Sequence, residues 1–364
     1  MLNNNIEFKS KFADMKLIDS LINDLYRIAK QNYIIMEVCG THTVAFLKFG
    51  LKSLLPKSIR VIAGPGCPVC VTPQKLIDYS ISLADYAIIV SYGDIFRVPG
   101  SFSSLEKVKS KGKDIRIVYS ITEALDIAID NPKKMVVFLA VGFETTAPAT
   151  ANVLIRAKKL NVNNFFILPG HKLIPPAIEY LCSNGVNANG FMLPGHVSTI
   201  IGCSAYQSIV DKYKIPCVVT GFEAIDIVTS IYKLVEQINN NDAKLDNTYS
   251  RGVKWYGNPV AKENIATVFR TADSEWRGIG SIPDSGLELN QNFHEFDAMQ
   301  KFGIKLSDTI IEDNGCRCGD VLLGIIEPEQ CVNFGNKCTP EEPIGPCMVS
   351  SEGTCAAYFK YGKT

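Results

Sequence analysis

Eight short apolar runs, rich in β-branched and aromatic residues, recur through the first two-thirds of this 364-residue chain. They are YIIMEV, IRVIA, YAIIV, IRIVY, MVVFLAV, FFIL, GFML and PCVVT. Stretches with helical spacing lie between them, such as LIDYSISLA, ITEALDIAI and TANVLIRAKKL. Strands that alternate with helices favour parallel sheets flanked by helices. We therefore expect an α/β fold.

Two motifs recur in a way that favours two lobes over a single barrel. GFE at 142–144 returns at 221–223, and LPGH at 168–171 returns at 193–196. Each copy lies at or directly after an apolar run. This pairing is the basis for expecting two separate parallel sheets.

After the last run the character of the chain changes. The segment NNNDAKLDN is polar and predicts a boundary, and six cysteines crowd into the last fifty residues. Such a tail has little apolar material for a core of its own and usually needs a metal or cluster to hold it. We expect a first α/β lobe over 1–135, a second over 136–238, and a C-terminal iron–sulfur lobe over 239–364.

Composition excludes several classes of protein. Lysine plus arginine equals aspartate plus glutamate, so no basic face for nucleic acid is indicated. No apolar run approaches the ~20 residues of a membrane helix, and the N-terminal segment lacks the apolar core of a secretory signal. We therefore expect a cytoplasmic location. Because thiols stay reduced there, twelve cysteines indicate metal or redox chemistry rather than disulfides.

Unusual residues follow the predicted strands directly. YIIMEV leads into CGTHT, which carries Cys39 and His42, and IRVIA leads into GPGCPVC, which carries Cys67 and Cys70. Open α/β sheets place their ligand crevices at these carboxyl ends of strands. Four further candidates hold similar positions: Asp94, Glu144, His171 and His196.

These weaker candidates each have a plainer interpretation. Asp94 and Glu144 can serve as acid–base groups, but a carboxylate at a strand end often caps the next helix. His171 and His196 each follow Pro-Gly, a turn that exposes the ring, and they can be site members or simple turn residues.

The CxxC pair of Cys67 and Cys70 suits redox chemistry, metal binding or a structural role. A preceding Gly-Pro-Gly turn lets backbone amides approach the sulfurs and stabilise thiolate. Together with Cys39 and His42, the pair can also form a Cys₃His zinc site.

The C-terminal thiols suit a 4Fe–4S cluster or zinc. Glu352 lies beside them and can connect them to the strand ends. Cys182, Cys203 and Cys217 have apolar or helical surroundings and are interpreted as buried small hydrophobes. The six C-terminal cysteines are Cys316, Cys318, Cys331, Cys338, Cys347 and Cys355.

Taken together, these motifs closely resemble those of the HypD-type maturation factors of nickel–iron hydrogenases. The matching stretches run almost end to end: CGTHT (39–43), GPGCPVC (64–70), SYGDIFRVPGS (91–101), GFETTAP (142–148), LPGH (168–171), LPGHVS (193–198), TGFE (220–223) and GPCMVSSEGTCAAYFKY (345–361).

The resemblance implies a scaffold on which the Fe(CN)2CO group of the hydrogenase active site is assembled. A small HypC-type chaperone would dock and share the iron, and a HypE-type protein would deliver cyanide. Cys39 would hold the iron, and Cys67 and Cys70 would be a dithiol/disulfide pair between iron and cluster. The 4Fe–4S ligands in the C-terminal lobe would be Cys331, Cys338, Cys347 and Cys355.

Two other functions remain open from the residues alone. One is a zinc-binding adaptor that uses Cys39, His42, Cys67 and Cys70, and the other is a thiol oxidoreductase that acts on protein disulfides through CxxC. The leading interpretation is a redox-active assembly scaffold rather than a classical turnover enzyme.

Overall fold

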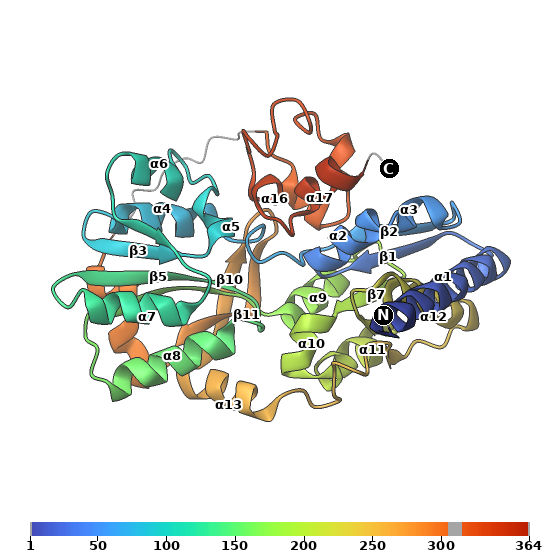
Figure 1. Ribbon diagram of the computed structural model, residues 1–364, viewed down its shortest axis with the longest axis horizontal. Coiled ribbons are helices and arrows are strands. Elements are labelled where there is room, and N and C mark those ends of the chain that lie inside the picture. Colours follow the sequence, from blue (N-terminus) through green and yellow to red (C-terminus); the bar gives the residue numbers. More distant parts are fainter. Residues whose placement is uncertain (1, 305–314, 363–364) are drawn as a thin grey trace.

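The computed structural model describes residues 2–304 and 315–362. It confirms the α/β class: two parallel sheets flanked by helices, accompanied by one antiparallel hairpin. Figure 1 shows the two sheets in separate lobes, with the cysteine-rich C-terminal segment above the place where they meet.

Sheet A has five parallel strands in the order β2-β1-β7-β8-β9. The first four were expected from their apolar runs, whereas β9 forms an edge within the polar boundary segment. Their bounds are β1 (Tyr33–Glu37), β2 (Ile59–Ala63), β7 (Gly190–Pro194), β8 (Cys217–Thr220) and β9 (Leu245–Asn247).

Sheet B has four parallel strands in the order β4-β3-β5-β6. Their bounds are β3 (Ala87–Ser91), β4 (Ile115–Ile117), β5 (Met135–Gly142) and β6 (Phe165–His171). The motifs recur once per sheet: GFE begins at the last residue of β5 in sheet B and directly follows β8 in sheet A, and LPGH spans the ends of β6 and β7.

The two sheets do not divide the chain at residue 135. Strand β1 pairs with β7, and β3 pairs with β5, so each sheet takes strands from both sides of the expected boundary between 1–135 and 136–238. The chain leaves sheet A after β2, builds all of sheet B, and returns at β7. The lobes are therefore joined by the crossings after β2 and before β7, and by a later one between β9 and Pro259–Val268.

Both faces of each sheet are buried, which explains the continuous apolar runs. In β5, Val136 and Phe138 pack on one side, while Val137 and Leu139 face a core shared by the two lobes. The same alternation occurs in β1, where Ile35 faces the helices on the outer side of sheet A and Met36 faces the shared core.

Helices cover the outer faces of the sheets. On sheet A the outer core includes residues of α1 (Leu2–Ile28), α2 (Gly40–Lys48), α12 (Ala224–Asn240) and α17 (Thr354–Tyr361). On sheet B it includes residues of α7 (Ile121–Asp130), α8 (Ala147–Lys159) and α13 (Pro259–Val268).

The remaining helices contribute to the shared core or connect elements. They are α3 (Leu51–Leu54), α4 (Gln74–Leu83), α5 (Gly93–Phe96), α6 (Leu105–Ser110), α9 (Ile174–Ser183), α10 (Gly195–Ile201), η1 (Cys203–Tyr206), α11 (Gln207–Tyr213), η2 (Gln291–Phe296) and α14 (Ala298–Phe302). In the described part of the chain, none of the helices has the length and apolar character needed to cross a membrane.

An antiparallel hairpin and an irregular segment complete the fold. The hairpin consists of β10 (Phe269–Trp276) and β11 (Gly280–Leu289) and packs against sheet B, where Leu173 N–H bonds to Ser285 O at 2.8 Å. The cysteine-rich segment has only short helices before α17: α15 (Cys318–Leu322), η3 (Pro328–Gln330) and α16 (Pro346–Val349).

Candidate functional site

Cys39 occupies the turn between β1 and α2. Its extended backbone (φ −157°, ψ 117°) places it at the N-cap of the helix. The Glu37 carboxyl folds over this turn: Oε2 accepts the Cys39 N–H at 2.8 Å, and Oε1 bonds the Thr43 hydroxyl. Burial, then the nearby charges of Glu352 and Glu37, raises the pKa of Cys39 to about 12. The thiol is therefore protonated at neutral pH.

The loop after β2 packs directly on this turn. The Gly64 N–H bonds to Glu37 O at 2.7 Å, and the Gly40 N–H bonds to Gly66 O at 3.0 Å. Gly66 has no room for a side chain, because a Cβ there would lie 2.2 Å from the backbone N of Cys39. The CGTHT and GPGCPVC motifs thus form one unit at the carboxyl ends of neighbouring strands.

A cavity of about 300 Å³ opens beside Cys39. Sheet A supplies His196 to its lining, sheet B supplies Thr145 from the loop after β5, and the C-terminal segment supplies Glu352. Glu352 is fixed at this position because its Oε1 accepts the Thr41 hydroxyl at 2.7 Å. The cavity therefore lies where all three parts of the molecule meet.

The two histidines of sheet A lie on the ring of Phe222. His196 stacks on it with ring centroids 3.8 Å apart, and His42 lies 4.9 Å from it. His42 is fully buried, its Nε2 is 3.1 Å from Thr220 O, and burial lowers its pKa to about 4. His42 is thus a neutral donor to the backbone, whereas His196 is exposed and lines the cavity.

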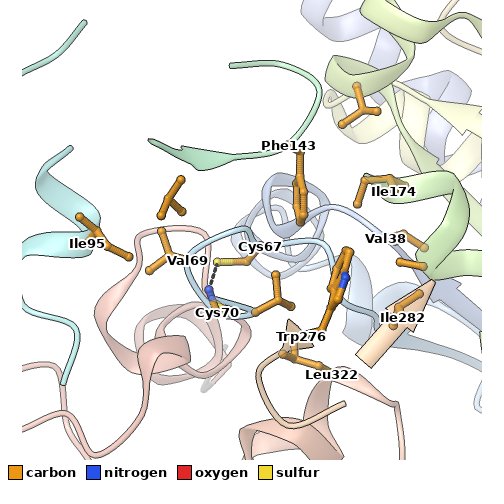
Figure 2. Close-up of a cluster of buried hydrophobic side chains, with 14 of the residues drawn as sticks. Val38, Cys67, Val69, Cys70, Ile95, Phe143, Ile174, Trp276, Ile282 and Leu322 are labelled. Atoms are coloured by element: carbon orange, nitrogen blue, oxygen red, sulfur yellow. Dashed lines mark hydrogen bonds between the residues drawn. The ribbon is translucent and has the colours of Figure 1, made fainter. Parts of the chain in front are cut away.

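Cys67 and Cys70 are free, buried thiols in the shared core. The Cys70 N–H points at the Cys67 sulfur, 3.3 Å away, as Figure 2 shows. Phe143 and Trp276 lie beside them, with ring centroids 6.0 Å apart. Burial raises the pKa of Cys70 well above its usual value, and its side chain also contacts Cys347 of the C-terminal segment.

The C-terminal cysteines gather around one small pocket. Cys347 has no exposed surface and contacts the thiols of Cys318, Cys355 and Cys70. At Cys338 the sulfur accepts the Ile344 N–H at 3.4 Å. All six cysteines expected to be cluster ligands or their alternatives line this pocket: Cys316, Cys318, Cys331, Cys338, Cys347 and Cys355.

The donor set of this pocket fits a thiolate-bound cluster. Its lining combines soft thiols with apolar side chains such as Phe334 and Met348, an environment that suits iron–sulfur ligation. Within residues 2–304 and 315–362, no three His, Cys, Asp or Glu side chains converge on a single-ion site. A four-iron cluster does not require such convergence, because its ligands spread over four corners.

Comparison with known proteins decides the family. A family model for HypD, described as the hydrogenase formation hypA family, matches residues 16–362. A putative hydrogenase expression/formation protein of Methanocaldococcus jannaschii is 44% identical, over 96% of this chain and 98% of its own. The HypD maturation factor of Escherichia coli is 43% identical over 98% and 97%, and that of Cupriavidus necator 43% over 98% and 98%. The chain belongs to the HypD family. As a member of that family it is a hydrogenase maturation factor.

In this HypD-family protein, Asp94 lies at the first turn of α5 and fastens the C-terminal segment. Its Oδ2 accepts the Ser350 hydroxyl at 3.0 Å and both the N–H and the hydroxyl of Ser351, at 3.2 and 2.9 Å. The next residue is Glu352. Asp94 therefore positions the loop that brings Glu352 to the cavity.

Glu144 and His171 lie in the sheet B lobe, outside the lining of the Cys39 cavity. Glu144 Oε1 accepts the Ile174 N–H at the start of α9, at 2.9 Å, and burial raises the pKa of this carboxyl to about 7. His171 is buried against Phe269, and burial lowers its pKa to about 4. Glu144 thus caps α9 rather than α8, the next helix along the chain, which the plainer interpretation anticipated.

Besides Thr145, sequence analysis did not single out Glu37 and Phe222. Glu37 is the only charged residue of the first apolar run and directly precedes the CGTHT motif, which was a usable signal. Phe222 gave no such signal, because its contacts with two histidines depend on the pairing of β7 with β8. Of the three cysteines interpreted as small hydrophobes, Cys203 and Cys217 are buried, and Cys182 is half-buried against the shared core.

Proposed function

We propose that this protein is the redox-active scaffold on which the Fe(CN)2CO group of nickel–iron hydrogenase is assembled. The observation that carries the proposal is a series of thiols between two sites. Cys347 of the C-terminal pocket contacts Cys70, Cys70 donates its N–H to Cys67, and the loop of Cys67 packs on the turn of Cys39.

The iron cargo would bind at Cys39. The cavity of about 300 Å³ greatly exceeds the ~30 Å³ share of one water molecule, so it can hold an iron with three diatomic ligands. Thiolate is a soft ligand that complements such a centre. One wall reaches the surface at exposed His196, so a HypC-type chaperone could supply a second thiolate and a HypE-type protein could deliver cyanide from outside.

The C-terminal thiols would hold a 4Fe–4S cluster through Cys331, Cys338, Cys347 and Cys355, with Cys316 and Cys318 beside them. When bound, such a cluster supplies one electron at a time. Oxidation of Cys67 and Cys70 to a disulfide releases two electrons and two protons, so each cycle of the pair requires two one-electron transfers.

The zinc-adaptor alternative fits the geometry less well. His42 uses Nε2 toward the carbonyl of Thr220 and packs its ring on Phe222. The ring lies outside the lining of the Cys39 cavity, and among residues 2–304 and 315–362 no three His, Cys, Asp or Glu side chains converge on a single-ion site.

The oxidoreductase alternative meets a different obstacle. Cys67 is 2% exposed and Cys70 is fully buried. Thiol–disulfide exchange requires direct attack between sulfurs, which these positions deny to a protein disulfide.

Complementation of a host that lacks its own HypD tests the proposal. The wild-type chain should restore nickel–iron hydrogenase activity, whereas Cys39→Ala and the double change Cys67→Ala, Cys70→Ala should not. Cys182→Ala, a matched control on α9, should behave like wild type. Full hydrogenase activity with Cys39→Ala would overturn the proposal.

A further inference from the structure

The tip of the β10–β11 hairpin joins the CxxC loop to the cysteine-rich segment. The Arg277 N–H bonds at 2.9 Å to the carbonyl of Val71, the residue after Cys70. Gly278 (φ +75°) packs on Gly319, and a Cβ added at Gly278 would lie 2.6 Å from its Cα. Because Gly319 directly follows Cys318, the tip is held between both groups of thiols.

The side chain of Arg277 faces the same region. Its Nη1 bonds to the carbonyl of Pro99 at 3.4 Å, and in the described part of the chain it pairs with no carboxylate. Its guanidinium is close enough to the thiols of Cys316 and Cys318 to interact with both electrostatically.

A second arginine nearby, in contrast, is paired with a carboxylate. Arg317 also lines the cysteine pocket, but its guanidinium pairs with the carboxylate of Asp320 and is about half exposed. Its charge is therefore neutralised locally and screened by solvent. Of these two arginines, Arg277 is the one that pairs with no carboxylate among the described residues.

We propose that Arg277 is the counter-charge of the cluster site and raises the potential at which a cluster bound there accepts an electron. The inference rests on the proposed function, since it requires a cluster at the C-terminal pocket. Reduction adds one negative charge to a site already surrounded by thiolates. A nearby positive charge stabilises the reduced form more than the oxidised form, and burial strengthens the effect.

The test is a reductive titration of the full-length protein, purified without oxygen, with dithionite as the one-electron donor. Visible absorbance reports the midpoint potential. Arg277→Gln should lower the equilibrium constant for reduction by on the order of tenfold, which is ~59 mV for one electron. Arg277→Lys keeps the charge and should recover most of the wild-type potential.

Arg270→Gln is the matched control. It removes an arginine from the same hairpin, but one that is exposed and paired with Glu288 away from the tip. Its potential should equal that of wild type.

The possible failures are distinguishable. Wild-type protein without iron and acid-labile sulfide would refute the cluster itself, and with it the proposed function. An intact cluster whose potential is the same in wild type and Arg277→Gln would overturn the Arg277 inference alone. If Arg277→Gln cannot retain a cluster, retention by Arg277→Lys supports the charge, and loss in both variants contradicts it.

Discussion

At the scale of single residues, the site depends on glycines that let neighbouring backbone approach and on acidic side chains that are buried away from water. Gly66 and Gly40 have no space for a Cβ, because Cys39 and Glu352 approach their backbones closely. Buried Glu37 and Glu144 are acids whose pKa values rise to about 8 and about 7. The sequence displays the glycines and acids, but their close neighbours come from distant parts of the chain.

Gly66→Ala should destabilise the protein, because the added Cβ would meet the backbone of Cys39 at 2.2 Å. Forced overpacking of this kind costs about 1–3 kcal/mol. Urea unfolding should show that loss, together with reduced retention of iron. Gly93→Ala is the control, since its Cβ would meet only the Ile117 side chain, at 3.7 Å. Equal stabilities of the two variants would contradict the packing described here.

Glu144→Gln should change the pH dependence of stability. Burial raises the pKa of the folded carboxyl from 4.5 to about 7. Its protonated form therefore favours folding below pH 4.5, and this contribution is lost as the pH rises to about 7. The shift corresponds to roughly 3 kcal/mol.

Unfolding free energies measured from pH 4 to pH 8 should therefore favour Glu144→Gln over wild type increasingly as the pH rises. Glu236→Gln, at an exposed position of α12, should show no such trend. A constant difference between Glu144→Gln and wild type across this range would show that the carboxyl titrates normally.

At the scale of elements, strands and helices follow from the local sequence pattern, whereas the pairing of strands depends on distant contacts. All eight apolar runs form strands, and the three quoted helical stretches form α4, α7 and α8. The hairpin was not predicted because β10 is mostly polar and is buried only at its two ends, Phe269 and Trp276. The sequence also did not predict that each sheet combines strands from both sides of residue 135, since the choice of partner strand depends on contacts between residues far apart in the chain.

One element-scale contact fixes the C-terminal loop. Asp94→Ala removes three hydrogen bonds to Ser350 and Ser351. Bonds to a charged acceptor contribute about 1.5–3 kcal/mol, so local opening should increase by about tenfold or more. Amide hydrogen exchange over residues 350–353 measures this. Asp126→Ala, at an exposed position of α7, should leave the exchange rates unchanged, and equal rates in both variants would exclude the tether.

At the scale of the whole molecule, three bodies meet at one cavity. Sheet A brings Cys39 and His196, sheet B brings Thr145, and the C-terminal segment brings Glu352 and the thiols that contact Cys70. The strand ends identified Cys39 and His196 from the sequence, and the cysteine-rich tail identified Glu352, but Thr145 was not singled out. Sequence could not show that His42, Glu144 and His171 lie outside the lining, because burial is decided by the packing of the complete fold.

Infrared spectroscopy of this protein, co-purified with a HypC-type chaperone from a host that makes nickel–iron hydrogenase, tests the central claim most directly. Wild type and Cys182→Ala should both show cyanide and carbonyl stretching bands, and Cys39→Ala should lose them. Bands of equal intensity in Cys39→Ala would contradict the assignment of Cys39 as the anchor of the iron group.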